Sequence, residues 1–339
     1  MNILLTSVGR RSYLVNYFKE ALKGRGLVHA ANSSSLSPAF LCADKCVVTP
    51  IIYSDDYIPF LKDYCIKNDI NAVISLFDVD LPVLALHRDE FMQLGVNVIV
   101  ADKDKVDICN DKWRTYLFLR ENGFAVPKTF VSLAEAEKAF KSGELSFPVM
   151  VKPRWGMGSL AIFEAENTEE LRVFYDKSKR NIMRSYLKFE AAQEEKACVL
   201  IQEKICGQEY GMDVINDLEG NYMHTVVKKK HAMRSGETDC AVTVDDENMR
   251  NIGKQLSLLL KHRGNLDVDV LMKKDVPYVL EMNARFGGGY PFSHMAGVNL
   301  PQAIVNWLAG ENVPEEMLRE ETGVCAHKDI SLVRMELDI

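Results

Sequence analysis

The chain has 339 residues, of which 47% are hydrophobic and 26% are charged, and both values are ordinary for a globular protein. This length indicates two or three domains with sizeable cores. The formal net charge of −7 argues against binding to nucleic acid or to an anionic membrane, because both attract a basic surface. No apolar run approaches the length of a membrane span, and the first residues lack the basic start of a secretory leader. We therefore expect a cytoplasmic protein that does not enter a membrane.

The first hundred residues show short apolar strands that alternate with helices. Such alternation predicts a doubly wound, parallel α/β domain. Only Gly9 follows the first strand, so the glycine fingerprint of NAD-binding domains is absent and NAD is not expected. Asp78 and Asp80 follow a strand at its carboxyl end, where ligands usually bind, although either residue could equally cap a helix. The predicted strands cover residues 2–6, 27–31, 47–49, 72–76 and 97–100.

A glycine-rich loop follows a strand that ends in Lys152 and Pro153. The loop contains Gly156, Gly158 and Ser159, and a second strand is predicted after it. Because no helix follows, this is not the phosphate loop of the Walker type. Its backbone N–H groups and a serine hydroxyl could still cover phosphates. Earlier in the chain, Asp111 is positioned to cap a helix that runs to about residue 122.

Two stretches with period-two alternation, residues 265–271 and 278–283, predict a β-hairpin. In the first stretch the apolar residues face one way, and Asp267 and Asp269 face the other. In the second, Val279, Glu281 and Asn283 share a face. A short turn over residues 274–276 would place Asp269 opposite Glu281, and Asp267 opposite Asn283.

Three carboxylates and one amide would then crowd a single patch of the hairpin. Like charges that face each other across a ladder are destabilising, so we expect a cation there. Oxygen ligands suit a hard ion such as Mg²⁺ or Mn²⁺. Arg285 and the three glycines Gly287, Gly288 and Gly289 follow, and together these features indicate phosphate chemistry. The alternative is that the acidic residues form an ordinary solvated face of the hairpin.

Several motifs occur in a fixed order along nearly the whole chain. They are Asp111-Lys112, the strand 148–152 with its Gly-Met-Gly-Ser loop, Gln202-Glu203-Lys204-Ile205, Gly207-Gln208-Glu209-Tyr210, Arg234-Ser235-Gly236-Glu237-Thr238 and Glu281-Met282-Asn283-Ala284-Arg285. This ordered set resembles the ATP-grasp superfamily, closest to the carbamoyl-phosphate-synthase-like carboxylate–amine ligases. The resemblance implies an N-terminal α/β domain (residues 1–108) followed by a two-lobed α+β fold. Its small lobe (residues 109–196) would carry the glycine-rich lid, and its C-terminal lobe (residues 197–339) the metal site.

The resemblance also implies roles for individual residues around ATP. The lysines Lys112 and Lys152 would contact the nucleotide phosphates, with Lys152 also reaching the adenine edge, while Arg234 would be a further phosphate contact. Arg285 would stabilise the transferring phosphoryl group. The lid would comprise Gly156, Gly158 and Ser159, the adenine hinge Gln202, Glu203, Lys204 and Ile205, and the ribose contact Glu209. The metal ligands would be Asp269, Glu281 and Asn283, with Asp267 as the alternative to Asp269.

The function implied by this resemblance is an ATP-dependent ligase. It would convert a substrate carboxylate to an acylphosphate and join it to an amine, with release of ADP and phosphate. An amino acid or small peptide is the expected substrate, and the candidates for contacting it are Arg10, Arg11 and Asp78. A homodimer is compatible with these expectations. Two alternatives stay open: an enzyme that releases a free acyl or carbamoyl phosphate, and an ATP-binding protein without catalytic activity. The residues also leave open which lysine of 228–230 faces the cleft.

Overall fold

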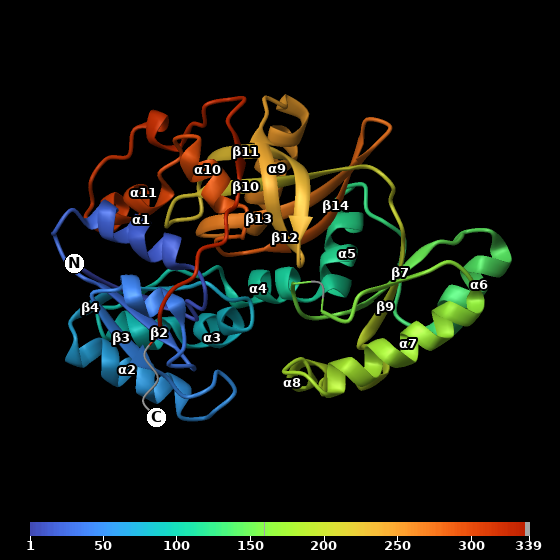
Figure 1. Ribbon diagram of the computed structural model, residues 1–339, viewed down its shortest axis with the longest axis horizontal. Helices are drawn as coiled ribbons and strands as arrows, with labels where there is room; N and C mark the ends of the chain where they lie inside the picture. The colour runs from blue at the N-terminus through green and yellow to red at the C-terminus, as the bar shows by residue number, and fades with distance from the viewer. Residues whose placement is uncertain (159, 336–339) are drawn as a thin grey trace.

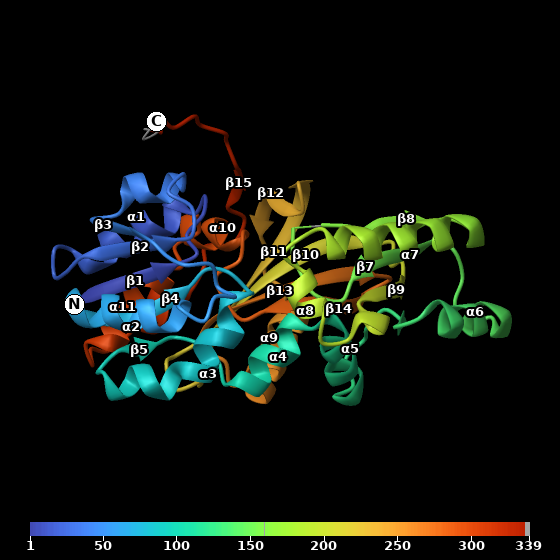
Figure 2. The ribbon, with the colours of Figure 1, turned by 90° about the horizontal axis from the view of Figure 1, so that it is seen from below.

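The computed structural model describes residues 1–158 and 160–335, and it begins with a parallel five-stranded sheet ordered β3-β2-β1-β4-β5 (Figure 1). Helices lie on both faces of this sheet, as Figure 2 shows for α1 and α3. The predicted doubly wound domain is therefore confirmed. Its elements are β1 (Asn2–Thr6), α1 (Ser12–Leu22), β2 (Val28–Asn32), η1 (Pro38–Cys42), β3 (Lys45–Val48), α2 (Tyr57–Lys67), β4 (Ile70–Ser75), α3 (Asp80–Gln93) and β5 (Asn97–Val98).

Alternate side chains of β1 pack into two different cores. Ile3 and Leu5 lie in a cluster with α1 and with α11 (Leu300–Leu308) from the far end of the chain. Leu4 points to the opposite face, where α2 and α3 cover the sheet. Because all three side chains are fully buried, β1 reads as a continuous apolar run, as expected for a central parallel strand.

The second unit is a small lobe built on four strands ordered β6-β9-β7-β8. It projects to the right in Figure 1, with α7 along one face of its sheet. Strands β7 and β9 pair antiparallel, with Lys152 opposite Leu200. The lobe contains β6 (Thr129–Phe130), α6 (Leu133–Ser142), β7 (Val149–Pro153), β8 (Phe163–Ala165), α7 (Thr168–Met183), α8 (Lys188–Ala191), η2 (Glu195–Ala197) and β9 (Val199–Glu203).

The third unit is a six-stranded sheet ordered β14-β13-β10-β11-β12-β15, all of its neighbouring strands being antiparallel. Together with the small lobe it confirms the expected two-lobed arrangement. The predicted hairpin is β13–β14, at one edge of the sheet. The elements are β10 (Gln208–Asn216), β11 (Tyr222–Arg234), β12 (Glu237–Thr243), α9 (Glu247–Leu260), β13 (Gly264–Lys273), β14 (Val276–Asn283), α10 (Tyr290–Met295), α11, η3 (Glu315–Leu318) and β15 (Cys325–His327).

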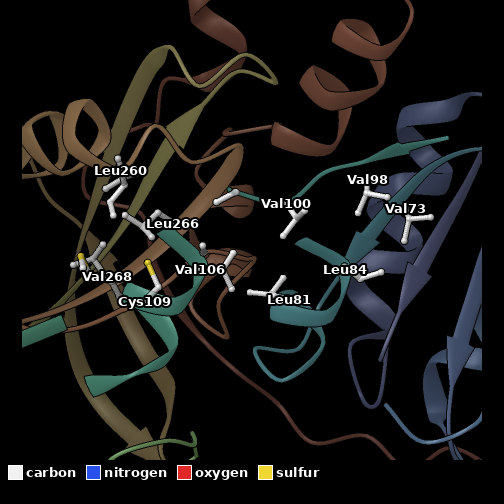
Figure 3. Packing of buried hydrophobic residues seen from close by; sticks show 14 of the residues in the cluster. Val73, Leu81, Leu84, Val98, Val100, Val106, Cys109, Leu260, Leu266 and Val268 are labelled. Atoms are coloured by element: carbon white, nitrogen blue, oxygen red, sulfur yellow. The ribbon is translucent and has the colours of Figure 1, made fainter. Parts of the chain in front are cut away.

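Two helices, α4 (Lys103–Asn110) and α5 (Lys112–Glu121), join the first domain to the others. Val106 and Cys109 of α4 belong to one apolar cluster with Leu81 of the first domain and Leu266 and Val268 of β13 (Figure 3). The two units therefore share a continuous core. The boundary expected at residue 108 falls inside α4, and the division into three domains stays a proposal.

The register of the hairpin is confirmed: Asp269 faces Glu281, and Asp267 faces Asn283. The turn is one residue shorter than the predicted 274–276: Val276 pairs with Lys273, and Lys274 and Asp275 make the turn, both with positive φ, as a two-residue hairpin turn requires. The predicted face of Val279 is wrong, because the register shifts between Asp269 and Val270 and Val279 packs in the core. This irregularity lets one strand present Val279 to the core and Glu281 to the cleft.

Candidate active site

The carboxylates of the hairpin are each held by a different cation. Asp269 Oδ1 lies 2.5 Å from Lys230 Nζ, and the same ammonium group lies 2.8 Å from Glu209. Glu281 Oε2 lies 3.5 Å from Lys112 Nζ. Burial would raise the pKa of Glu281, but the nearby Lys112 and other cations lower it, so this carboxylate stays ionised.

Asp267 is engaged differently, because Arg285 holds it. Arg285 Nη1 lies 3.0 Å from Asp267 Oδ2. A Cβ atom on Gly287 would approach the Asp267 carboxyl carbon to 2.1 Å, so only glycine fits beside this carboxylate. Burial raises the pKa of Asp267, and Arg285 opposes that rise. Asp269 lies directly across from Glu281 and is free of this arginine.

Arg285 also pairs with Asp78, which the sequence indicated only as a candidate substrate contact. Both Nε and Nη2 of Arg285 donate to Asp78 Oδ2, at 3.1 and 2.8 Å. Both residues are buried, at 8% and 7% exposed. The first domain therefore positions the arginine of the third unit across 207 residues of sequence. Asp80, the other candidate, is fully buried and accepts hydrogen bonds from Thr6, Tyr57 and Ser75.

Of the three consecutive lysines, Lys230 is the one that faces the cleft. Lys228 is directed inward next to it but ion-pairs with buried Asp213 and donates to Ser293 Oγ at 3.0 Å. Lys229 is half-buried and lies on the other side of β11, as strand alternation requires. Lys228 thus serves as a buried link between β10, β11 and α10.

Replacing Lys228 should destabilise the protein without a direct effect on the cleft. Lys228→Met leaves Asp213 buried without its ion-pair partner, and we expect a loss of about 3 kcal/mol in the free energy of unfolding. Thermal unfolding measures the loss, with Lys229→Met as the matched control. Equal unfolding temperatures for the two variants would contradict this assignment.

Lys152 lies at the buried end of the small-lobe strand β7. Its Nζ donates to Gln202 Oε1 at 2.8 Å, and the Gln202 amide in turn donates to Thr129. Burial, together with the charge of Lys112, lowers the pKa of Lys152 to about 8. An anionic ligand would reverse this shift, which is the behaviour expected of a phosphate-binding lysine.

This lowered pKa predicts a pH-dependent affinity for nucleotide. As pH rises from about 7 to about 9, Lys152 loses its proton in the free protein, and the affinity for ATP should fall about tenfold. Fluorescence titration with a labelled ATP analogue measures the effect, and Lys152→Met should bind weakly with no such dependence. The free energy of unfolding depends on pH in the opposite direction. The lysine of the unfolded chain keeps its proton to a higher pH than Lys152 of the folded protein, so the free energy of unfolding should increase as pH rises through this range. An equally steep affinity profile in Lys152→Met would contradict the assignment.

Three adjoining cavities meet at this site. The lid cavity, about 320 Å³, is lined by Lys112, Gly156, Gly158, Glu209, Asp269 and Glu281, among others. The arginine cavity, about 100 Å³, is lined by Arg11, Lys230, Asp267, Glu281, Asn283 and Arg285, among others. The interdomain cavity, about 360 Å³, is lined by residues that include Asp78, Asn110, Lys112, Gly156, Glu190 and Asn283. Shared lining residues place Glu281 and Asn283 where the cavities adjoin.

Not every predicted site residue lies at these cavities. Arg234 is largely exposed, pairs with Asp239 at 2.8 Å and is absent from the lining of all three. Lys204 is half-buried and pairs with Glu164, while Glu203 and buried Ile205 lie where β9 leads into β10. Arg10 is exposed, whereas Arg11 lines the arginine cavity. Ser159 lies outside the described residues.

The hairpin presents oxygen atoms of the kind that bind a hard cation. Among residues 1–158 and 160–335, no group of three His, Cys, Asp or Glu side chains could by itself hold a metal ion. Asp269 and Glu281 face each other, and Asn283 adds an amide oxygen two residues further. Mg²⁺ is usually bound by one or two carboxylates together with substrate phosphates and water. The residues therefore fit a Mg²⁺ ion that arrives with a nucleotide.

Two family models match this chain. Residues 3–99 match the family model of the PylC-like N-terminal domain, and residues 109–289 match that of the ATP-grasp domain. Within the described part of the chain, no helix is both long and apolar enough to cross a membrane.

Solved structures share the fold at low sequence identity. The biotin carboxylase domain dimer of 2-oxoglutarate carboxylase from Hydrogenobacter thermophilus, in complex with MgADP, ADP and bicarbonate, has a TM-score of 0.73 at 16% identity, over 94% of this chain and 72% of that chain. The L-amino acid ligase from Bacillus licheniformis has a TM-score of 0.70 at 18% identity, over 95% of this chain and 78% of that chain. N5-carboxyaminoimidazole synthetase from Staphylococcus aureus, complexed with ADP, has a TM-score of 0.69 at 14% identity, over 92% and 78%. With a PylC-like N-terminal domain ahead of a matched ATP-grasp domain, the chain belongs to the ATP-grasp family of ATP-dependent enzymes.

Proposed function

We propose that the protein is an ADP-forming ligase that activates a substrate carboxylate with ATP and joins it to an amine. The observation that supports this most is the meeting of three cavities at Glu281 and Asn283. A ligase of this type must hold a nucleotide, a carboxylate and an amine around one reacting centre. The L-amino acid ligase of the same fold makes an amino acid or a small peptide the preferred substrate class.

In the proposed complex the lid cavity holds ATP. Lys112 and Lys152 neutralise phosphate charge, while Gly156 and Gly158 of the lid, both with positive φ, bring backbone N–H groups close. Glu209 accepts from the ribose hydroxyls, and the segment 202–205 meets the adenine edge. Asp269, Glu281 and Asn283 hold Mg²⁺, which supplies charge neutralisation and alignment of the phosphates. We favour Asp269 over Asp267 because Asp269 lies opposite Glu281 and lines the lid cavity with it, whereas Asp267 is not part of that lining.

The chemistry requires positioning and electrostatics rather than a protein nucleophile. A carboxylate oxygen of the substrate, held by Arg285, bonds to the γ-phosphorus while the bond to the β-phosphate oxygen breaks and ADP leaves. The amine nitrogen then bonds to the acyl carbon and loses a proton, the bond from carbon to the phosphate oxygen breaks, and phosphate leaves. Closure of the lid would keep water away from the acylphosphate.

A screen of amino acids, small peptides and small carboxylates for stimulated ADP release tests this function. The proposal expects ADP release that depends on both a carboxylate and an amine, and a product mass equal to their sum minus water. A product without an amide bond would instead indicate release of a free acyl or carbamoyl phosphate. Nucleotide binding without turnover for every pair tested would indicate a non-catalytic protein.

A further inference from the structure

Lys230 of β11 reaches across a neighbouring strand to a carboxylate of the hairpin. Its Nζ lies 2.5 Å from Asp269 Oδ1 of β13 and 2.8 Å from Glu209 Oε1 of β10. In the sheet, β10 lies between β11 and β13, so the lysine side chain spans the width of one strand. Lys230 is only 7% exposed, and its ammonium group is thus held at one of the proposed metal ligands.

A glycine of β10 gives this side chain its path. Gly211 pairs with Asp269 on one side and with Lys228 on the other. A Cβ atom at position 211 would lie 3.1 Å from Lys230 Cε, closer than ordinary van der Waals contact. The side chain of Lys228 ends at Asp213. Lys230, two residues further along β11, is therefore the lysine that crosses the glycine to reach the hairpin.

The ammonium group of Lys230 supplies the cation that the crowded hairpin requires. Burial would lower the pKa of Lys230, but the charges of Asp269 and Glu209 raise it above its ordinary value, so the lysine stays protonated. The other two carboxylates of the hairpin lie beside other cations of the protein. Each hairpin carboxylate is therefore balanced by a side chain of the protein itself.

A metal ion at Asp269 must compete with this ammonium group. Mg²⁺ binds a carboxylate oxygen at about 2.1 Å and gives up its water reluctantly. Because Lys230 Nζ lies 2.5 Å from Asp269 Oδ1, the metal ion and the ammonium group would approach the same oxygen atoms and repel each other. The free ion therefore gains little from displacing a cation that is already in place.

A nucleotide changes this competition from two sides. Its triphosphate brings negative charge to the metal ligands, where it attracts both the metal ion and the lysine. In the proposed complex its ribose hydroxyls donate to Glu209, the second carboxylate that holds Lys230. The same lysine therefore connects the ribose contact with the metal ligand.

We propose that Lys230 is a tethered cation that makes metal binding conditional on nucleotide: it holds Asp269 until ATP engages Glu209 and brings phosphate charge beside the metal ligands. This inference rests on the ATP and Mg²⁺ site of the proposed ligase function and adds to it the order in which nucleotide and metal bind. Because coupling between two ligands is reciprocal, nucleotide raises the affinity for the metal by the same factor by which the metal raises the affinity for nucleotide.

Titration of the intact protein with Mn²⁺ at pH 7 and without nucleotide, followed by the electron paramagnetic resonance of free Mn²⁺, tests this role. The Lys230→Met variant should bind Mn²⁺ about tenfold more tightly than the wild type, because the substitution releases Asp269 from a charge-assisted hydrogen bond. The side chains of Asp269 and Glu209 are each 31% exposed, so water can solvate them in the variant and the fold should be retained.

Two further variants separate the position of the ammonium group from its charge. Lys152→Met is the matched control, since it removes a nearby buried lysine that donates to Gln202 rather than to a hairpin carboxylate, and it should change the Mn²⁺ affinity by less than about threefold. Gly211→Ala keeps every charge but crowds Lys230 Cε, so it should raise the affinity for free Mn²⁺ about threefold. This variant tests the inference even if Lys230→Met does not fold.

Nucleotide affinity supplies a second readout. A labelled ATP analogue is titrated with and without Mg²⁺, and the factor by which Mg²⁺ raises its affinity should be about tenfold smaller in Lys230→Met than in the wild type. Equal Mn²⁺ affinity in the wild type and Lys230→Met, an equal gain in Lys152→Met, or an unchanged Mg²⁺ factor would overturn the inference. These are binding measurements, so failure of the ligase function, seen as the absence of an amide product, is detected separately.

Discussion

Glu281→Gln should reduce ATP-dependent turnover about a thousandfold while the fold is retained. Glu281 lies where the lid cavity and the arginine cavity adjoin, opposite Asp269 and beside Lys112. The substitution removes one negative charge from the proposed metal site. It should therefore weaken the binding of Mg²⁺ at the point where phosphate charge develops. The amide keeps nearly the same volume, so packing in β14 should be preserved.

Steady-state ADP release, with Mg²⁺-dependent nucleotide affinity as a second readout, measures the effect of Glu281→Gln. Asp275→Asn is the matched control, since it removes a carboxylate from the turn of the same hairpin, where asparagine tolerates the positive φ of 64°. The control should retain full turnover. Turnover of Glu281→Gln within about threefold of the control would rule out the proposed metal site.

Arg285→Lys is the second substitution with a large expected effect, a loss of about a hundredfold or more in turnover. Arginine donates here to Asp78 through two nitrogens and to Asp267 through a third. Lysine keeps the charge but cannot make this fork, so the substrate carboxylate would lose its orientation. Nucleotide affinity should change by no more than about threefold, because Arg285 is proposed to act on the transferring group and its acceptor.

The pairing with Asp78 supplies a control for Arg285→Lys. Asp78→Asn should lower turnover by itself, since it leaves the arginine less firmly positioned. Because both residues act through one contact, the double variant should be little worse than Arg285→Lys alone. Additive losses, or an ATP affinity that falls in parallel with turnover, would show that Arg285 does not act as proposed.

Much of the fold could be predicted because its signals are local. The apolar runs of β1 and β4 predict a buried parallel sheet, and the alternation in residues 265–271 and 278–283 predicts the hairpin. The pair Asp269–Glu281 is as predicted, although the turn is one residue shorter than the predicted 274–276, because the register shifts between Asp269 and Val270. Asp111 caps α5 as predicted, accepting from the backbone of Trp113 and Arg114. The ordered motifs also led to the ATP-grasp family, which the family comparison confirms.

The features that could not be predicted depend on contacts between distant segments. Nothing near Asp78 indicates that it holds Arg285, because the two lie in different units and meet only in the folded chain. Val279 does not follow the period-two pattern because the register of the hairpin shifts between Asp269 and Val270. Which of the three lysines faces the cleft depends on Asp213 of β10 and Ser293 of α10, because these residues hold Lys228. Both partners lie far from residues 228–230 in the sequence.

The most direct test of the central proposal follows an oxygen atom from the substrate carboxylate. With a carboxylate substrate labelled with ¹⁸O and a full reaction mixture, mass spectrometry of the released phosphate shows which oxygen attacked the γ-phosphorus. If the carboxylate is activated as an acylphosphate, the phosphate formed together with the amide carries one ¹⁸O atom from the substrate. Phosphate that carries no label, with its new oxygen taken from water, would contradict this account.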